Sequence, residues 1–259
     1  MYRFLLRPKW LLLHVVVLSS VVGMIFLARW QWDKHIARDA FVETVQGRLA
    51  AEPKELAPLL SKQTPAANIE WFVVTASGSY LATGELRELN RTQNGFNGIN
   101  VLTPFQINSG PIIIVNRGFV PDGAKVPAAP TGTIVVGGTA RTSQTRQTGE
   151  LTDDPSASNN EVRRVDLAFI AKHIDQTIAP VYLDLIATQP ASPSPPVPVP
   201  PPNLGSGPPH VSYTVQWLFF SLCAIAGWVF AVRRSAKSAR QAATHAQTAT
   251  DEPQSLPSA

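Results

Sequence analysis

Two uncharged apolar stretches near the ends of the chain constrain its fold more than any other feature. They comprise residues 11–27 and residues 215–232. At about 17 and 18 residues, each reaches the lower end of the length that crosses a bilayer as a helix. Tryptophans bracket the first stretch and one opens the second, as aromatic residues do at membrane interfaces. These are Trp10, Trp30, Trp32 and Trp217. The pattern predicts two transmembrane helices around a central domain.

The first stretch also shares features with a cleaved signal peptide, because basic residues precede an apolar run. The run is long, however, and no small-x-small cleavage site precedes Arg29 and Trp30. We therefore expect a membrane anchor that remains in the mature protein.

Basic residues beside the two stretches predict the orientation of the helices. They are Arg3, Arg7 and Lys9 before the first stretch, and Arg233, Arg234, Lys237 and Arg240 after the second. No Lys or Arg lies between Lys172 and the second stretch, although three basic residues follow the first stretch and conflict in part. Lys and Arg are enriched on the cytoplasmic side. We therefore predict a multi-pass protein of the bacterial cell membrane, with both termini cytoplasmic and the central domain outside.

Charge and motif content exclude several classes of function. The net charge of +4 is explained mostly by this topology signal, and no basic stripe with interleaved aromatic residues indicates nucleic-acid binding. Cys223 is the single cysteine, so neither an intramolecular disulfide nor a paired-thiolate metal site can form. The chain has no phosphate-binding glycine loop, no His-Glu-x-x-His and no Gly-x-Ser-x-Gly. We expect that the protein is not an enzyme.

The central part reads as a domain rich in β-structure. Residues 69–81, 99–107, 111–120, 133–141 and 180–188 have strand-like composition. A short turn containing glycine joins the second and third of these and favours a hairpin. Five or six strands in consecutive hairpins predict an α+β domain with a mainly antiparallel sheet, which could curl into a small barrel.

Helices and a loop complete this domain. Residues 33–50 are expected to continue the first membrane helix, and residues 53–60 to form a short turn of helix. Residues 166–178 predict a helix with Asp166 as its cap. Its apolar face would carry Leu167, Ile170, Ile174 and Ile178. Residues 145–161 are polar and rich in turn formers, so we expect an exposed loop.

The predicted organisation has six parts. They are a cytoplasmic N-terminus (1–9), a first transmembrane helix (10–30), the extracytoplasmic domain (31–189), a proline-rich arm (190–209), a second transmembrane helix with its interfacial entrance (210–232) and a disordered cytoplasmic tail (233–259). Ten of the twenty residues of the arm are proline, which favours stiff polyproline II. The arm is either a spacer or a docking strip for a partner.

His14 and His210 are the two histidines beside or within the apolar stretches. A polar side chain within the bilayer needs a partner, so we expect His14 to be satisfied by the other helix or by interfacial water. His210 follows two prolines, and Tyr213 lies one helical turn later. Gln216 and Trp217 extend this face by another turn.

The chemistry of these four residues supports two interpretations. A neutral imidazole at an apolar boundary suits axial ligation of haem iron. Tyr213 and Gln216 could hydrogen-bond a propionate or formyl group, and Trp217 could stack on the macrocycle. Alternatively, the cluster is an interfacial anchor that fixes the depth of the helix.

Four segments carry a resemblance to a known family. They are "LARWQWDKHIARDA", "GELRELNRTQNGFNGINVLTPFQI", "GPIIIVNRGFVP" and "GPPHVSYTVQWLFFS". With the two flanking membrane helices, they resemble the surfeit-locus protein family of cytochrome c oxidase assembly factors. Phe119 departs from the family, which usually has Trp there, and the proline-rich arm and polar tail look like an elaboration.

The resemblance implies a membrane assembly factor that helps deliver or retain haem a while the catalytic subunit of cytochrome c oxidase matures. His210 would be the histidine that contacts the haem iron, and binding of haem a would be transient. The implied partners are oxidase subunits, haem a and the membrane. Two alternatives stay open, a scaffold that binds oxidase subunits without contacting haem and a sensor or envelope-binding module. Arg117 follows an apolar strand, where it could pair with a propionate or, alternatively, close the barrel by pairing with Asp122.

Overall fold

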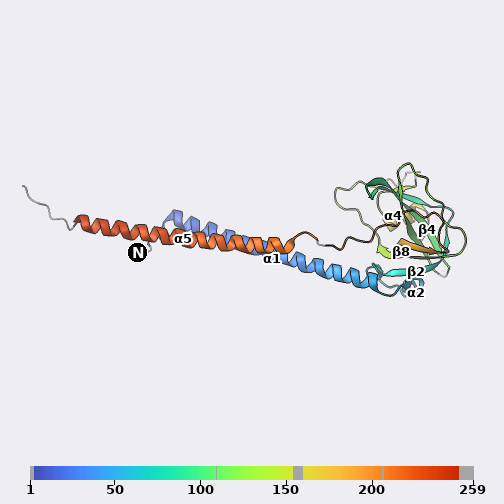
Figure 1. Ribbon diagram of the computed structural model, residues 1–259, viewed down its shortest axis with the longest axis horizontal. Helices are drawn as coiled ribbons and strands as arrows, with labels where there is room; N and C mark the ends of the chain where they lie inside the picture. Colours follow the sequence, from blue (N-terminus) through green and yellow to red (C-terminus); the bar gives the residue numbers. More distant parts are fainter. Residues whose placement is uncertain (1–2, 109, 154–159, 206, 251–259) are drawn as a thin grey trace, which may run out of the picture. The chain divides into compact units, whose positions relative to one another are not determined.

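The computed structural model describes residues 3–108, 110–153, 160–205 and 207–250 (Figure 1). The chain forms two compact units. The helical unit consists of Met1–Val42 and Leu204–Ala259, and the sheet unit consists of Glu43–Asn203. This division confirms that two apolar helical segments flank one central domain.

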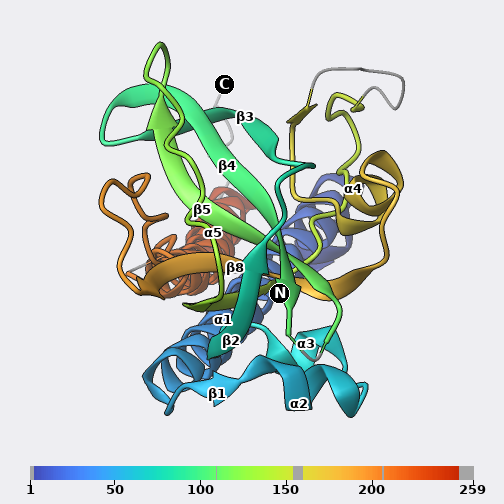
Figure 2. The same ribbon diagram turned by 90° about the vertical axis from the view of Figure 1, so that its right-hand side faces the viewer.

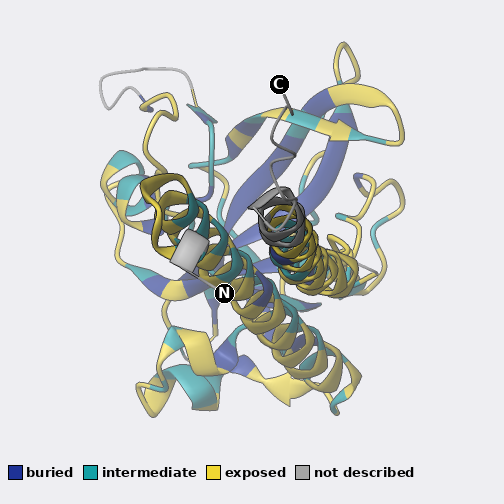
Figure 3. Ribbon diagram, turned by 90° about the vertical axis from the view of Figure 1, so that its left-hand side faces the viewer, coloured by how far each residue is buried: buried dark blue, intermediate teal, exposed yellow. Residues whose placement is uncertain are grey.

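The helical unit is built from two long helices. A short 3-10 helix, η1 (Arg3–Leu6), precedes α1 (Pro8–Ala50), and α5 (His210–Thr250) closes the chain. Both long helices are apolar enough to cross a membrane, with mean hydropathies of 2.5 and 1.9 in their most apolar windows. Figure 3 shows that most of their surface is exposed, as expected for helices whose apolar side chains face lipid.

α1 continues well beyond its apolar stretch. At 43 residues it measures about 65 Å, about twice the thickness of the hydrocarbon core. The predicted juxtamembrane helix is therefore confirmed as a continuation of the membrane helix.

The C-terminal tail differs from the prediction. α5 remains helical to Thr250, whereas the sequence predicted disorder from residue 233 onward. The segment contains many Ala, Arg and Gln residues, which have high helix propensity and extend a helix that has already formed. Residues 251–259 lie outside the described residues.

The sheet unit contains a mixed sheet of eight strands. They are β1 (Lys54–Glu55), β2 (Val73–Tyr80), β3 (Leu86–Gln93), β4 (Phe96–Ile107), β5 (Ile112–Pro121), β6 (Ile134–Thr142), β7 (Glu161–Val162) and β8 (Ile178–Gln189). Their order is β1-β2-β6-β8-β5-β4-β3-β7, and β2 also pairs with β4 (Figure 2). Five of the eight pairings between described strands are antiparallel, while β1–β2, β3–β7 and β5–β8 are parallel. The sheet is thus mixed, and the small barrel stays a prediction.

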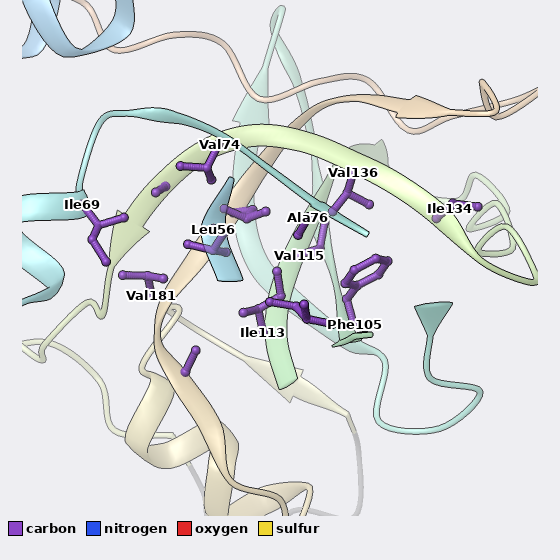
Figure 4. Packing of buried hydrophobic residues seen from close by; sticks show 14 residues of the cluster. Leu56, Ile69, Val74, Ala76, Phe105, Ile113, Val115, Ile134, Val136 and Val181 are labelled. Carbon is purple, nitrogen blue, oxygen red and sulfur yellow. The ribbon is translucent and has the colours of Figure 1, made fainter. Parts of the chain in front are cut away.

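The predicted hairpin of β4 and β5 is confirmed, and β5 forms the centre of the unit. The two strands pair antiparallel from Gly98↔Pro121 to Gln106↔Ile112. Nine of the ten residues of β5 are buried. Ile113 and Val115 pack in one cluster with Phe105 (Figure 4), whereas Ile114 packs on the opposite face with Leu102. Successive side chains of a strand point to opposite faces, so an uninterrupted apolar run suits a strand covered on both sides.

β3 is the long strand that the sequence analysis missed. Only its alternate residues Leu86 and Glu88 are buried, so its composition is mostly polar. The turn that follows has Asn94 and Gly95 with φ of 53° and 82°. An Asn-Gly pair with positive φ is the preferred hairpin turn. This pair was the signal in the sequence that could have revealed β3.

Three short helices lie within the sheet unit: α2 (Leu56–Ser61), α3 (Ala66–Ile69) and α4 (Leu167–His173). The predicted cap of α4 is confirmed, because the Asp166 carboxylate accepts from the backbone N–H groups of Ala168 and Phe169. The predicted end of this helix was wrong. α4 ends at His173, Asp175 takes a positive φ of 53°, and Ile178 begins β8.

Part of the proline-rich arm joins the sheet. Val197 and Phe119 exchange two backbone hydrogen bonds of 2.7 and 2.9 Å, and Pro196 is buried. The Gln93 side chain donates to the Pro198 carbonyl at 2.8 Å. The arm is therefore not only a spacer, because it adds a short extended segment to the end of β5, beyond the residues that pair with β8.

Candidate functional site

The entrance to α5 is shaped by the prolines that precede it. The His210 backbone N–H donates to the Pro208 carbonyl at 2.7 Å, and that of Tyr213 donates to the Pro209 carbonyl at 3.1 Å. Proline lacks an N–H and has a fixed φ, so it is favoured at the first positions of a helix. This local geometry determines where His210 enters the helical unit.

α1 and α5 pack antiparallel in this unit. The Thr214 hydroxyl donates to the Ala28 carbonyl at 3.4 Å, and the Trp228 indole donates to His14 Nδ1 at 2.9 Å. The two contacts are separated by 14 residues on each helix. The residue numbers fall from Ala28 to His14 on α1 and rise from Thr214 to Trp228 on α5, so the helices run in opposite directions. Ala28, Thr214 and Ser221 are buried. Such small side chains let membrane helices approach closely.

His210 is held by α1. Its Nδ1 lies 2.8 Å from Oε1 of Gln31, and both residues are half-buried. An amide oxygen can only accept a hydrogen bond, so Nδ1 carries the proton. In the neutral imidazole Nε2 then has a free lone pair, and no other described residue makes a hydrogen bond to that nitrogen. This is the tautomer that a metal ligand needs.

His14 has the opposite arrangement. Its Nδ1 accepts from the Trp228 indole, so Nε2 carries the proton in the neutral ring. The His14 ring also lies 6.0 Å from Trp10 and 5.7 Å from Trp228 between ring centres. The sequence left two partners open for His14, the other helix and interfacial water. In the structure the partner is Trp228 on the other helix. The tautomer of His14 does not present Nε2 as a ligand.

Two of the three neighbours predicted for His210 lie on its side of α5. At about 100° per residue, Trp217 and Tyr213 lie within about 60° of His210 around the helix, and Gln216 lies about 120° away. Tyr213 is 44% exposed and Gln216 is exposed. Trp217 is half-buried, with its ring 6.0 Å from that of Phe220. Tyr213 and Trp217 thus lie on the same side of α5 as His210, one and two turns further along the helix, whereas Gln216 faces a different direction.

These residues fit one axial haem ligand. A single imidazole with an unbonded Nε2, followed on the same helix face by a phenol and an indole, offers one iron ligand and two aromatic groups for a macrocycle. Within the described residues, no group of three or more His, Cys, Asp and Glu side chains could hold a bare metal ion. One histidine nitrogen suits a metal that brings its own equatorial ligands, as haem iron does.

Arg117 belongs to the sheet unit and is enclosed there. Its side chain is 2% exposed and pairs with Glu85 at 3.1 Å. It also donates to the carbonyl oxygens of Pro127 and Ala128, both at 2.8 Å. The acidic partner is thus Glu85 and not Asp122, the partner that the sequence predicts as the alternative to a propionate. The guanidinium neutralises Glu85 and ties the loop after β5 to the sheet.

A buried acidic network in the sheet unit was not predicted. Glu88 is 1% exposed and bonds to Arg91 and to Asn100, the latter at 2.8 Å. Asp184 accepts from Asn116 at 2.9 Å and Arg141 at 3.4 Å.

Burial raises the pKa of both Glu88 and Asp184, and the neighbouring arginines lower these pKa values by less. Local sequence gives no signal for this network, because its members come from several strands.

Gln31 is the contact residue of His210 that the sequence analysis overlooked. It lies between Trp30 and Trp32, four residues after the first apolar stretch ends. In the sequence it stands only within the segment "LARWQWDKHIARDA", which carries the family resemblance. A polar amide flanked by two interfacial aromatics was the signal that could have identified it.

Comparisons with known proteins agree on one family. The family model described as "SURF1 family" matches residues 18–222. An uncharacterized SURF1-like protein of Mycobacterium bovis is 30% identical over 233 residues, covering 86% of this chain and 83% of the relative. One from Mycobacterium tuberculosis matches to the same extent. A SURF1-like protein of Monosiga brevicollis is 28% identical over 241 residues, covering 87% of each chain.

Proposed function

Because the chain belongs to the SURF1 family, known in general for assembly of cytochrome oxidase, we propose that it is a membrane assembly factor that handles haem a. Haem a is the cargo, and the chain delivers or retains it while the catalytic subunit matures. The proposal assigns the chain no catalytic reaction. Its partners are the oxidase subunits and the membrane.

The observation that carries the haem proposal is the orientation of His210. Gln31 accepts from Nδ1 at 2.8 Å and leaves Nε2 available to iron. Tyr213 and Trp217 provide aromatic groups on the same side of α5, and one axial bond is easier to break than two. A carrier that must release its cargo benefits from such single ligation.

The proposed placement follows the basic residues that flank the helices. α1 and α5 cross the bacterial cell membrane, the termini lie in the cytoplasm, and the sheet unit lies outside. His210 is then at the outer interface, where an amphipathic macrocycle can place its propionates toward the headgroups.

The His210→Ala variant tests this proposal. One interfacial imidazole contributes little to folding, so the protein should stay abundant and membrane-inserted, while co-purified haem a and assembled oxidase should both fall severalfold. Tyr213→Phe should act in the same direction with a smaller effect. His35→Ala on α1 is the matched control and should leave haem content and oxidase unchanged.

The same measurements separate the alternatives. Normal haem content in His210→Ala would remove the ligand role. If oxidase assembly also stayed normal, His210 would be only an interfacial anchor. Normal haem content with reduced oxidase would instead favour a scaffold that contacts oxidase subunits without touching haem.

A further inference from the structure

We propose that Gln31 is a positioning residue that fixes the tautomer and ring orientation of His210 for iron ligation. This inference rests on the proposed haem function. It gives α1 a part in the site, because Gln31 lies on α1, whereas the proposed iron ligand His210 lies on α5.

The hydrogen bond determines which nitrogen is free. Oε1 of Gln31 can only accept, so at 2.8 Å it selects the tautomer with the proton on Nδ1. Histidine ligands of metals generally donate their second N–H to a carbonyl, carboxylate or water, which orients the ring and raises its basicity. Gln31 supplies this partner from the neighbouring helix.

The position of Gln31 is itself fixed by packing. Ala28 lies three residues before it on the same face of α1 and accepts from Thr214. Thr214 lies four residues after His210 on α5, and its hydroxyl also approaches the His210 carbonyl at 3.0 Å. Two adjacent contacts therefore align the turns that carry Gln31 and His210.

His14 provides a comparison within the same unit. It lies 17 residues before Gln31 on α1, about 25 Å along the helix. Its Nδ1 accepts from an indole, and an indole N–H can only donate. The two histidines of the helix pair are thus held in opposite tautomers by partners of opposite hydrogen-bonding character, and only His210 presents Nε2 as a lone pair.

The test uses the full chain in detergent with haemin, iron protoporphyrin IX, as the probe. Gln31→Leu removes the acceptor and should weaken haemin binding about tenfold, the lower end of the usual effect of losing such a partner. Gln31→Glu keeps an acceptor that cannot donate. The haemin affinity of this variant should therefore stay near the wild-type value, in contrast to that of Gln31→Leu.

A spectroscopic readout separates positioning from packing. The carboxylate of Gln31→Glu gives the imidazole more anionic character, which stabilises ferric iron. The midpoint potential of bound haemin should fall, and the iron–imidazole stretching frequency of the ferrous form should rise. Gln31→Leu should shift both quantities in the opposite direction. Gln46→Leu and Gln46→Glu, at an exposed glutamine of the same helix, should leave both unchanged.

Several outcomes overturn the inference. Haemin affinity and spectra of Gln31→Leu equal to wild type would show that Gln31 does not position the ligand. A haemin affinity of Gln31→Glu as low as that of Gln31→Leu would show that Nδ1 does not donate to this residue. If His210→Ala binds haemin as wild type does, the proposed function fails instead. Loss of binding in His210→Ala with no effect at Gln31 refutes only the positioning role.

Discussion

Two tyrosines of the sheet unit show how a single hydroxyl group can affect stability in either direction. Tyr182 is 2% exposed, and its hydroxyl accepts from the Gln144 amide at 3.1 Å. The Tyr80 hydroxyl is buried and finds no hydrogen-bond partner among the described residues. Burial raises the pKa of Tyr80 to about 12 and that of Tyr182 still further, so both are neutral phenols at physiological pH.

Replacing each tyrosine by phenylalanine should therefore have opposite effects. Tyr80→Phe removes an unsatisfied buried hydroxyl and should raise the free energy of unfolding by about 1 kcal/mol. Tyr182→Phe leaves the Gln144 amide without its acceptor and should lower that free energy by about 1 kcal/mol. Urea unfolding of the detergent-solubilised chain, followed by circular dichroism, measures both. Destabilisation of similar size in the two variants would show that the Tyr80 hydroxyl is satisfied in solution.

At the scale of elements, the contact between β5 and the proline-rich arm depends on one glycine. Gly118 has a φ of +123°, which strongly favours glycine. A Cβ placed there would overlap the carbonyl group of Val197. The next residue, Phe119, exchanges the backbone hydrogen bonds with Val197. Gly118 thus allows the arm to approach the strand.

Gly118→Ala should detach the arm from β5. The backbone strain alone should cost about 1–3 kcal/mol, and the clash with Val197 should break the pairing. Hydrogen exchange measured by mass spectrometry should then show faster exchange at the amides of Phe119 and Val197.

Gly123→Ala is the matched control, since Gly123 also has a positive φ, +78°, but a Cβ added there would meet no atom within 4 Å. It should leave the exchange at Phe119 and Val197 slow. Unchanged protection of both amides in Gly118→Ala would mean that the arm tolerates the added methyl group.

At the scale of the whole molecule, the orientation in the membrane decides on which side His210 lies. The four basic residues after the second apolar stretch predict a cytoplasmic C-terminus. A reporter that works only in the cytoplasm should be active when fused after Ala259. The same reporter should be inactive when fused to a chain truncated after Gly149 in the sheet unit. Activity of an export-dependent reporter after Ala259 would contradict the topology and place His210 at the inner interface.

The sequence by itself determined the features that depend on local pattern. Apolar length and flanking charges identify the membrane helices. The uninterrupted run in β5 and the cap at Asp166 identify their elements, because strand burial and helix capping involve residues close in sequence. His210 was identified because its chemical type and position at an apolar boundary are visible in a single segment.

Only the tertiary structure decided which distant residues meet. Gln31 and His210 are 179 positions apart, Phe119 pairs with Val197, and Arg117 finds Glu85. No local periodicity contains these pairings, since they follow from the helix register and the strand order. The difference between the tautomers of His14 and His210 has the same origin. Each imidazole takes its proton position from a partner on the other helix, and packing alone brings an amide oxygen to one and an indole N–H to the other.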